Sequence, residues 1–222
     1  MTDFLKDGIE KMEHKTFEID LPEGYSEKKH VNAKSAKFGI VMNLLALVIF
    51  VAVLVPAVLL LTFRENAAFD FALAIPGSIF LGTILSLVYV VLHELVHGWA
   101  YKRRTGQKLT FGLSWSCAYC GVPNIYTYRR TALFAVLAPF VFFSAVMTVV
   151  GAASFAVYML ASSDVAVLIC AITFVVNATV FGLHLGGCTG DLYIALLFAT
   201  KFKDDRALMR DTGPEMFLYL PD

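Results

Sequence analysis

The chain has 222 residues, of which 58% are hydrophobic and 16% are charged. An apolar share of this size is typical of a multi-pass membrane protein and argues against a soluble globular domain. The 18 basic and 18 acidic residues balance to a net charge of zero, so the charge gives no reason to expect a nucleic-acid partner.

Four apolar stretches are each long enough to cross a bilayer, given a helical rise of about 1.5 Å per residue and roughly 30 Å of hydrocarbon. Glycines at 186, 187 and 190 should break the last helix, and another apolar run follows from Asp191. The expected fold is an all-α membrane protein with about four transmembrane helices, the last one broken, plus a short cytoplasmic β-hairpin. The predicted spans run from about Phe38 to Phe63, Phe71 to Tyr101, Thr131 to Leu160, and from Val165 to Leu185.

Basic residues alternate from one connecting segment to the next. They gather before the first span, between the second and third, and after the fourth. The first-to-second connection holds only Arg64, and the third-to-fourth connection holds none. The positive-inside rule then predicts a multi-pass protein of the cell membrane with both termini in the cytoplasm. The predicted organisation is a cytoplasmic segment over 1–37, a membrane domain over 38–200 and a cytoplasmic tail over 201–222.

The second span ends in the pattern H-E-x-x-H, made by His93, Glu94 and His97. Positions i and i+4 share one face of a helix, so both imidazoles can reach one metal ion, with Glu94 beside them to handle protons. The alternative is a pair of hydrogen-bonded core histidines. Polar groups are costly inside a membrane, which favours the functional interpretation. Ala100 and Arg103 stand where the longer metzincin pattern needs Gly and His, so a third ligand must come from elsewhere.

Asp191 is the predicted third ligand. It lies ten residues before Lys201, and His93 lies nine before Lys102, so the two fall at similar depth if both helix ends meet the same interface. A carboxylate is an ordinary zinc ligand. The alternatives are that Asp191 caps a short helix, or that His184 is the ligand. Asn177 could contact substrate or orient the site, although helix packing accounts for it equally simply.

Several short motifs together resemble the putative zincin peptidases, a family of small bacterial membrane proteins related in outline to site-2 proteases. Site-2 proteases carry an Asn-Pro-Asp-Gly type motif, whereas Asp191 here stands between Gly190 and Leu192. The resemblance implies Zn²⁺ held by His93, His97 and Asp191, with Glu94 as the general base. It rests on His93 to Gly98, Ala118-Tyr119-Cys120, Ala138-Pro139-Phe140 and Gly190-Asp191.

The function expected from these features is zinc-dependent peptide hydrolysis, within or at the membrane near its cytoplasmic face, on a membrane protein or peptide. Zinc would activate a water molecule, whose proton Glu94 would accept. The alternative is a membrane protein that binds metal without hydrolysis, such as a transporter or sensor. Glu94 favours the peptidase, because metal binding alone does not need a carboxylate between the histidines.

The loop after the metal motif predicts a hairpin. Residues 109–115 alternate between apolar and small polar side chains, which is typical of a strand, and Gly121 to Pro123 suggests a turn before a return strand at 125–128. Such a hairpin could hold an unwound substrate by strand addition, or act as a lid.

The tails and cysteines give weaker signals. Residues 17–21 and 217–220 could be short strands that pair, although the sequence alone does not choose their partners, and residues 6–15 suggest a solvated helix face. Cys117 and Cys120 form an isolated C-x-x-C, and facing the cytoplasm they should be reduced thiols.

Overall fold

A computed structural model describes residues 15–64, 71–113 and 118–222. Within these residues the chain forms two compact units that alternate along the sequence. The first, here called the helical unit, takes in 36–93 and 138–192. The second, called the sheet unit, takes in the described parts of 1–35, 94–137 and 193–222.

The described residues include four helices long and apolar enough to cross a membrane, as the sequence predicts. Their bounds differ from the predicted ones by a few residues at most. A shorter apolar helix, α6 (Thr189–Thr200), follows the fourth, and only Cys188 separates the two, which confirms the predicted break. The four long helices are α2 (Ala36–Leu61), α3 (Phe71–Thr105), α4 (Arg129–Leu160) and α5 (Asp164–Gly187).

Large apolar side chains on the long helices are exposed in the isolated chain. Leu44 and Val48 of α2, Leu87 of α3 and Val149 of α4 are each at least 60% exposed. Soluble proteins rarely leave this much apolar surface in water. The helices therefore present the surface that a lipid environment would cover.

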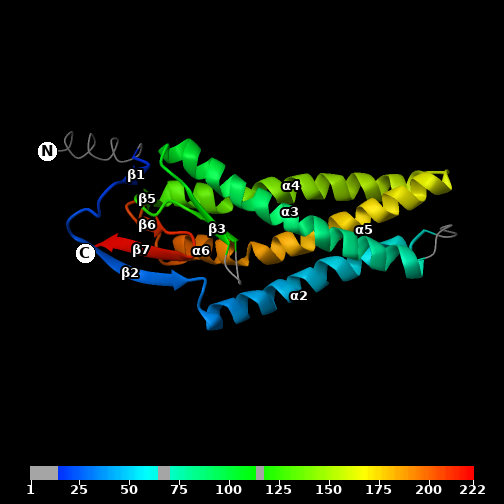
Figure 1. Ribbon diagram of the computed structural model, residues 1–222, viewed down its shortest axis with the longest axis horizontal. Helices are drawn as coiled ribbons and strands as arrows, with labels where there is room; N and C mark the ends of the chain where they lie inside the picture. The colour runs from blue at the N-terminus through cyan, green and yellow to red at the C-terminus, as the bar shows by residue number, and fades with distance from the viewer. Residues whose placement is uncertain (1–14, 65–70, 114–117) are drawn as a thin grey trace. The chain divides into compact units, whose positions relative to one another are not determined.

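Within the helical unit, glycines bring α5 close to its neighbours. A Cβ atom added at Gly186 would lie 2.9 Å from the backbone oxygen of Ala46 in α2, and one at Gly182 would lie 3.0 Å from the Phe50 ring. Gly82 of α3 meets Thr179 of α5 in the same way. Small residues at such crossings let helix backbones approach closely in a membrane. In Figure 1, α2 runs beside α5.

The connection after α2 and the connection after α4 meet in the helical unit. Arg64 donates to the carbonyl of Ala161 over 2.7 Å and also to that of Tyr158. The hydroxyl of Tyr158, which is fully buried, donates to the carbonyl of Leu61 over 2.6 Å. These bonds satisfy the carbonyls at two helix ends. They also join the two connections that the charge pattern predicts on the outer side.

The sheet unit contains a five-stranded antiparallel sheet in the order β1-β5-β6-β7-β2. Its longest pairing joins β2 to β7, which lie side by side in Figure 1. The strands are β1 (Phe17–Glu18), β2 (Tyr25–Asn32), β5 (Tyr126–Tyr128), β6 (Leu208–Asp211) and β7 (Glu215–Pro221).

The places in the sequence from which these strands come constrain how the chain could cross a membrane. β1 and β2 precede α2, β5 lies between α3 and α4, and β6 and β7 follow α6. An open sheet cannot be split by a bilayer, because its backbone groups would lose their partners in hydrocarbon. The N-terminal segment, the middle loop and the C-terminal tail therefore lie on the same side of any membrane that the helices cross.

The sheet corrects the all-α expectation, since the described chain is mostly helical but also has antiparallel strands. Two strands of this five-stranded sheet, β2 and β6, were not predicted. The segments near residues 17 and 217 do form strands of one sheet, but they do not pair with each other: β1 pairs with β5, and β7 lies between β6 and β2. Alternation of apolar and polar residues predicts that a segment is a strand. It does not predict which distant segment the strand pairs with.

The predicted hairpin exists with a different return strand. β3 (Thr110–Leu113) pairs with β4 (Ala118–Gly121), whereas the expected partner, β5, belongs to the larger sheet. The run Ala-Tyr-Cys-Gly of β4 has no clear alternation, which is why it was missed. Residues 114–117, with Trp115 and Cys117, and the predicted helix face at 6–14 lie outside the described residues.

Candidate metal centre

His93 and Asp191 meet within the helical unit. Nε2 of His93 lies 3.3 Å from Oδ2 of Asp191, and the two side chains are only 10% and 16% exposed. This contact joins the end of α3 to the start of α6. It agrees with the prediction that His93 and Asp191 lie at similar depth. Asp191 is the third residue of α6 and therefore not the residue that caps it.

The shallow break between α5 and α6 positions Asp191. Cys188 keeps a right-handed helical conformation, with φ of −73° and ψ of −1°, and its N–H bonds to the carbonyls of His184 and Gly186. The N–H of Leu192 then bonds to the carbonyl of Cys188 over 2.9 Å. Because the chain keeps these bonds across the break, the first turn of α6 holds Asp191 firmly.

His97 follows His93 by one turn on the same helix, α3, and is 7% exposed. In the sheet unit its Nδ1 lies 2.8 Å from the carbonyl oxygen of Ala135. A carbonyl only accepts hydrogen bonds, so Nδ1 carries the proton and, in the neutral ring, Nε2 keeps its lone pair. That is the tautomer a metal needs at Nε2.

Pro139 explains why the carbonyl of Ala135 can accept from a side chain. In a helix the carbonyl of residue 135 would accept from the N–H of residue 139. Proline has no N–H, so α4 supplies no i+4 donor to Ala135. The Ala-Pro-Phe motif of the sequence therefore leaves a carbonyl available for His97.

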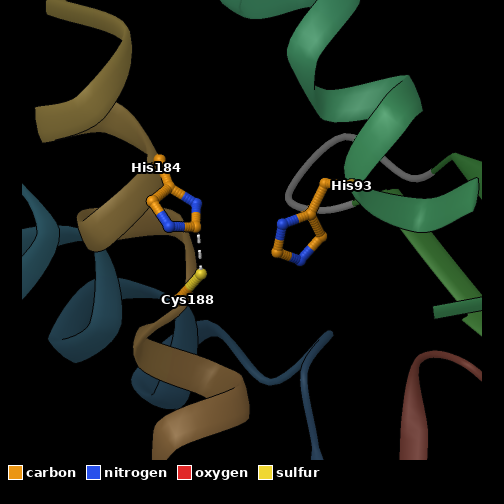
Figure 2. A group of neighbouring side chains, drawn as sticks. All are labelled: His93, His184 and Cys188. Carbon is orange, nitrogen blue, oxygen red and sulfur yellow. Dashed lines mark hydrogen bonds between the residues drawn. The ribbon is translucent and has the colours of Figure 1, made fainter. Parts of the chain in front are cut away.

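His93 has a different partner at its own Nδ1. The hydroxyl of Tyr89, one turn earlier on α3, lies 2.7 Å from this nitrogen and 2.6 Å from Nδ1 of His184. His184 is fully buried, and its Nε2 lies 3.0 Å from Oγ of Ser144 in α4. His184 thus has hydrogen-bond partners on two neighbouring helices, α3 and α4. Figure 2 shows the imidazoles of His93 and His184 lying near each other, with Cys188 beside His184.

Glu94 is half-buried and directly follows His93 on α3. In the sheet unit, burial together with the charges of Asp211 and Glu94 raises the pKa of the Cys120 thiol to about 12. Cys120 is therefore a protonated thiol at neutral pH, which makes it a poor nucleophile and a poor metal ligand. The C-x-x-C gains no special chemistry from this cysteine.

Asn177 has a packing role in the helical unit. Its side-chain amide donates to the carbonyl of Met147 in α4 over 3.0 Å, and Gly151 leaves room for the amide. Of the two roles considered for Asn177, the structure supports helix packing.

Sequence reasoning missed Tyr89 and Ser144. Tyr89 could have been found, because it precedes His93 by four residues and so shares its helix face. Ser144 had no local signal, since only the packing of α4 against α5 brings it to His184.

Comparison with known proteins gives one clear family assignment. No curated protein and no solved structure matches the chain. A family model described as putative zincin peptidase matches residues 86–205, which is more than half of the chain and includes the H-E-x-x-H motif and Asp191. The chain therefore belongs to the putative zincin peptidase family.

Proposed function

We propose that this protein is a zinc-dependent, site-2 protease-like peptidase that hydrolyses peptide bonds within or at the membrane, near its cytoplasmic face. His93, His97 and Asp191 are the metal ligands, and Glu94 is the general base. The observation that carries the proposal is the approach of the Asp191 carboxylate to Nε2 of His93, 3.3 Å apart in the helical unit.

The proposed ligands suit zinc by their chemistry. Two imidazole nitrogens and one carboxylate oxygen form a donor set found in catalytic zinc sites, which keep a further position open. Ala135 holds a proton on Nδ1 of His97, and this leaves Nε2 of that ring for the ion. His93 lies one turn away on the same helix, and its Nε2 is the nitrogen that faces Asp191.

Zinc held by these residues would supply Lewis acidity to activate water and polarise the scissile carbonyl. Glu94 then accepts the proton of the attacking water and delivers it to the leaving amine. Glu94 directly follows His93 on α3, and in the H-E-x-x-H pattern this residue is the base and not a ligand.

The cytoplasmic location rests on the basic residues that flank the spans. His93 and His97 precede Lys102, so they lie near the end of the span on that side. The substrate is a membrane protein or peptide with a locally unwound segment, because a helix keeps its amide groups in its own hydrogen bonds.

A Glu94→Gln variant tests the proposal. The exchange preserves size and helix propensity but removes the base, so hydrolysis should fall by at least about a hundredfold. Zinc content should be unchanged, since Glu94 is not a ligand. The measurement is cleavage of a membrane-anchored peptide by the full chain in liposomes, with zinc quantified in the same samples.

The ligand variants provide the matched comparison. His93→Ala and Asp191→Ala should lose metal and cleavage together, because two protein ligands hold zinc poorly. Cleavage by Glu94→Gln at the wild-type rate would refute the assigned base. A zinc-loaded wild type that cleaves none of a panel of membrane peptides would favour the non-hydrolytic metal-binding alternative.

A further inference from the structure

A second cluster of donor groups also includes His93. One ligand-type atom from each of His93, His184 and Cys188 lies within 4.8 Å of the others, and all three residues are buried (Figure 2). Such a cluster could hold a second metal ion or could serve the first site through hydrogen bonds. The position of the Tyr89 hydroxyl decides between these two possibilities.

The hydroxyl of Tyr89 occupies the space between the facing ring nitrogens. It lies 2.7 Å from Nδ1 of His93 and 2.6 Å from Nδ1 of His184. Both distances are those of good hydrogen bonds. A metal ion between these two nitrogens would have to displace the hydroxyl, so the geometry favours a hydrogen-bonded chain.

The hydrogen bonds that link His93, Tyr89 and His184 can run in two directions, depending on where the protons lie. Tyr89 has one proton, so it donates to one ring and accepts from the other. If it donates to His93, the neutral ring carries its proton on Nε2, where Asp191 accepts it and no metal can bind. If it donates to His184, then His93 donates from Nδ1, and its Nε2 lone pair faces Asp191.

The surroundings of His184 favour the second direction. The backbone carbonyl of Phe140 in α4 favours a proton on the His184 ring, because a carbonyl only accepts hydrogen bonds. Ser144, one turn further along α4, faces Nε2 of the same ring at 3.0 Å. Nδ1 instead faces two groups that can donate, the Tyr89 hydroxyl and the Cys188 thiol, the latter at 3.5 Å. His184 therefore carries its proton on Nε2 and accepts at Nδ1.

We propose that Tyr89 and His184 are positioning residues that hold His93 in the tautomer able to bind metal through Nε2. This inference rests on the proposed function, because it assumes that His93 is a zinc ligand. His97 reaches the same state through the carbonyl of Ala135. Both histidines of the motif thus donate from Nδ1. His97 donates to the backbone carbonyl of Ala135, and His93 donates to Tyr89, whose hydroxyl in turn donates to His184 of α5.

The test compares Tyr89→Phe with Tyr158→Phe in the full chain. Each variant removes one hydroxyl from a buried tyrosine of the helical unit. The hydroxyl of Tyr158 donates to the backbone carbonyl of Leu61, at the end of α2. Loss of the partner that orients a ligating histidine usually lowers metal affinity by about 10- to 100-fold. The Zn²⁺ dissociation constant, measured by competition with a chelator, should rise by that factor in Tyr89→Phe and stay within about threefold of wild type in Tyr158→Phe.

Two further measurements separate a positioning role from a purely structural one. Nitrogen NMR of histidine-labelled, zinc-loaded wild type should show His93 protonated at Nδ1, and the Tyr89→Phe variant should weaken or shift that signal while retaining a folded spectrum. His184→Gln, which can still accept from Tyr89, should restore much of the affinity that His184→Ala loses.

The outcomes distinguish the two proposals. Equal zinc affinity in the two tyrosine variants would overturn the positioning role while leaving the zinc site intact. If Cys188→Ala lost zinc as completely as His93→Ala, and the cobalt-loaded wild type showed thiolate-to-metal charge transfer, the cluster would be a ligand set and the inference would be wrong. A wild type that binds no zinc would overturn the proposed function and this inference with it.

Discussion

Pro139 shows how one residue can prepare another for its chemistry. Its missing N–H leaves the Ala135 carbonyl to accept from His97, and so fixes which nitrogen of that ring carries the proton. The ligand candidates themselves could be predicted from spacing and depth, and the contact between His93 and Asp191 agrees with that prediction. The hydrogen-bond partners that set each ring's tautomer could not, because Ala135, Ser144 and His184 reach the histidines only through helix packing.

A Pro139→Ala variant should weaken zinc binding. The new N–H would bond to the Ala135 carbonyl within α4 and compete with His97 for it. The expected loss of affinity is about tenfold, the lower end of the range for disturbing a ligand's partner, since the carbonyl remains in place. Helix stability should rise, because proline inside a helix costs up to about 3 kcal/mol relative to alanine.

Pro56→Ala in α2 is the matched control, since it also replaces a proline inside a long apolar helix. It should raise thermal stability without affecting zinc affinity. If the Pro139 and Pro56 variants bound zinc equally well, the carbonyl of Ala135 would have no part in preparing His97.

The sheet shows what alternation can and cannot predict for an element. The segments near residues 17 and 217 were recognised as strands, but the sequence could not choose their partners, because pairing depends on segments up to about two hundred positions apart. β2 was missed since its sequence, Tyr-Ser-Glu-Lys-Lys-His-Val-Asn, is polar over most of its length. Helices were easier, because length and apolar composition alone identify a membrane span.

Alkaline pH should destabilise this sheet. Burial and a hydrogen bond to Glu18 raise the pKa of Tyr128 well above its usual range, and burial raises the pKa of Tyr25 and Tyr219. A tyrosine whose folded-state pKa exceeds its unfolded value of about 10 adds stability below pH 10 and loses it as the pH rises. Thermal unfolding followed by circular dichroism should therefore show a falling midpoint above about pH 10.

A Tyr128→Phe variant measures how much Tyr128 contributes to the loss of stability above pH 10, apart from Tyr25 and Tyr219. Losing the bond to Glu18 should cost about 0.5–1.5 kcal/mol at neutral pH, and the decline above pH 10 should become shallower. A decline as steep as that of the wild type would show that Tyr128 does not contribute to it.

At the scale of the whole molecule, one sheet gathers three segments that the charge pattern assigns to the cytoplasm. The connections predicted outside are joined separately, through Arg64 and Tyr158. The sequence could supply the number of helices long and apolar enough to cross a membrane, and a predicted direction for each. It could not reveal that N-terminal, middle and C-terminal segments fold together, because that depends on long-range strand pairing.

Cysteine labelling in intact cells tests the orientation. In a variant whose four native cysteines are replaced by alanine, a cysteine at Ser163 should react with a membrane-impermeant maleimide. A cysteine at Lys203 should react only after the cells are permeabilised. The reverse pattern would contradict the proposed orientation, and equal labelling of both positions in intact cells would contradict the two-sided topology.

Metal content tests the central claim most directly. Full-length wild type, purified without chelators, should contain one zinc ion per chain by elemental analysis, and Asp191→Ala should contain well under half of that. Asp191→Glu, which keeps a carboxylate, should retain more zinc than Asp191→Ala. A wild type without stoichiometric transition metal, or an Asp191→Ala variant with the full amount, would contradict the account.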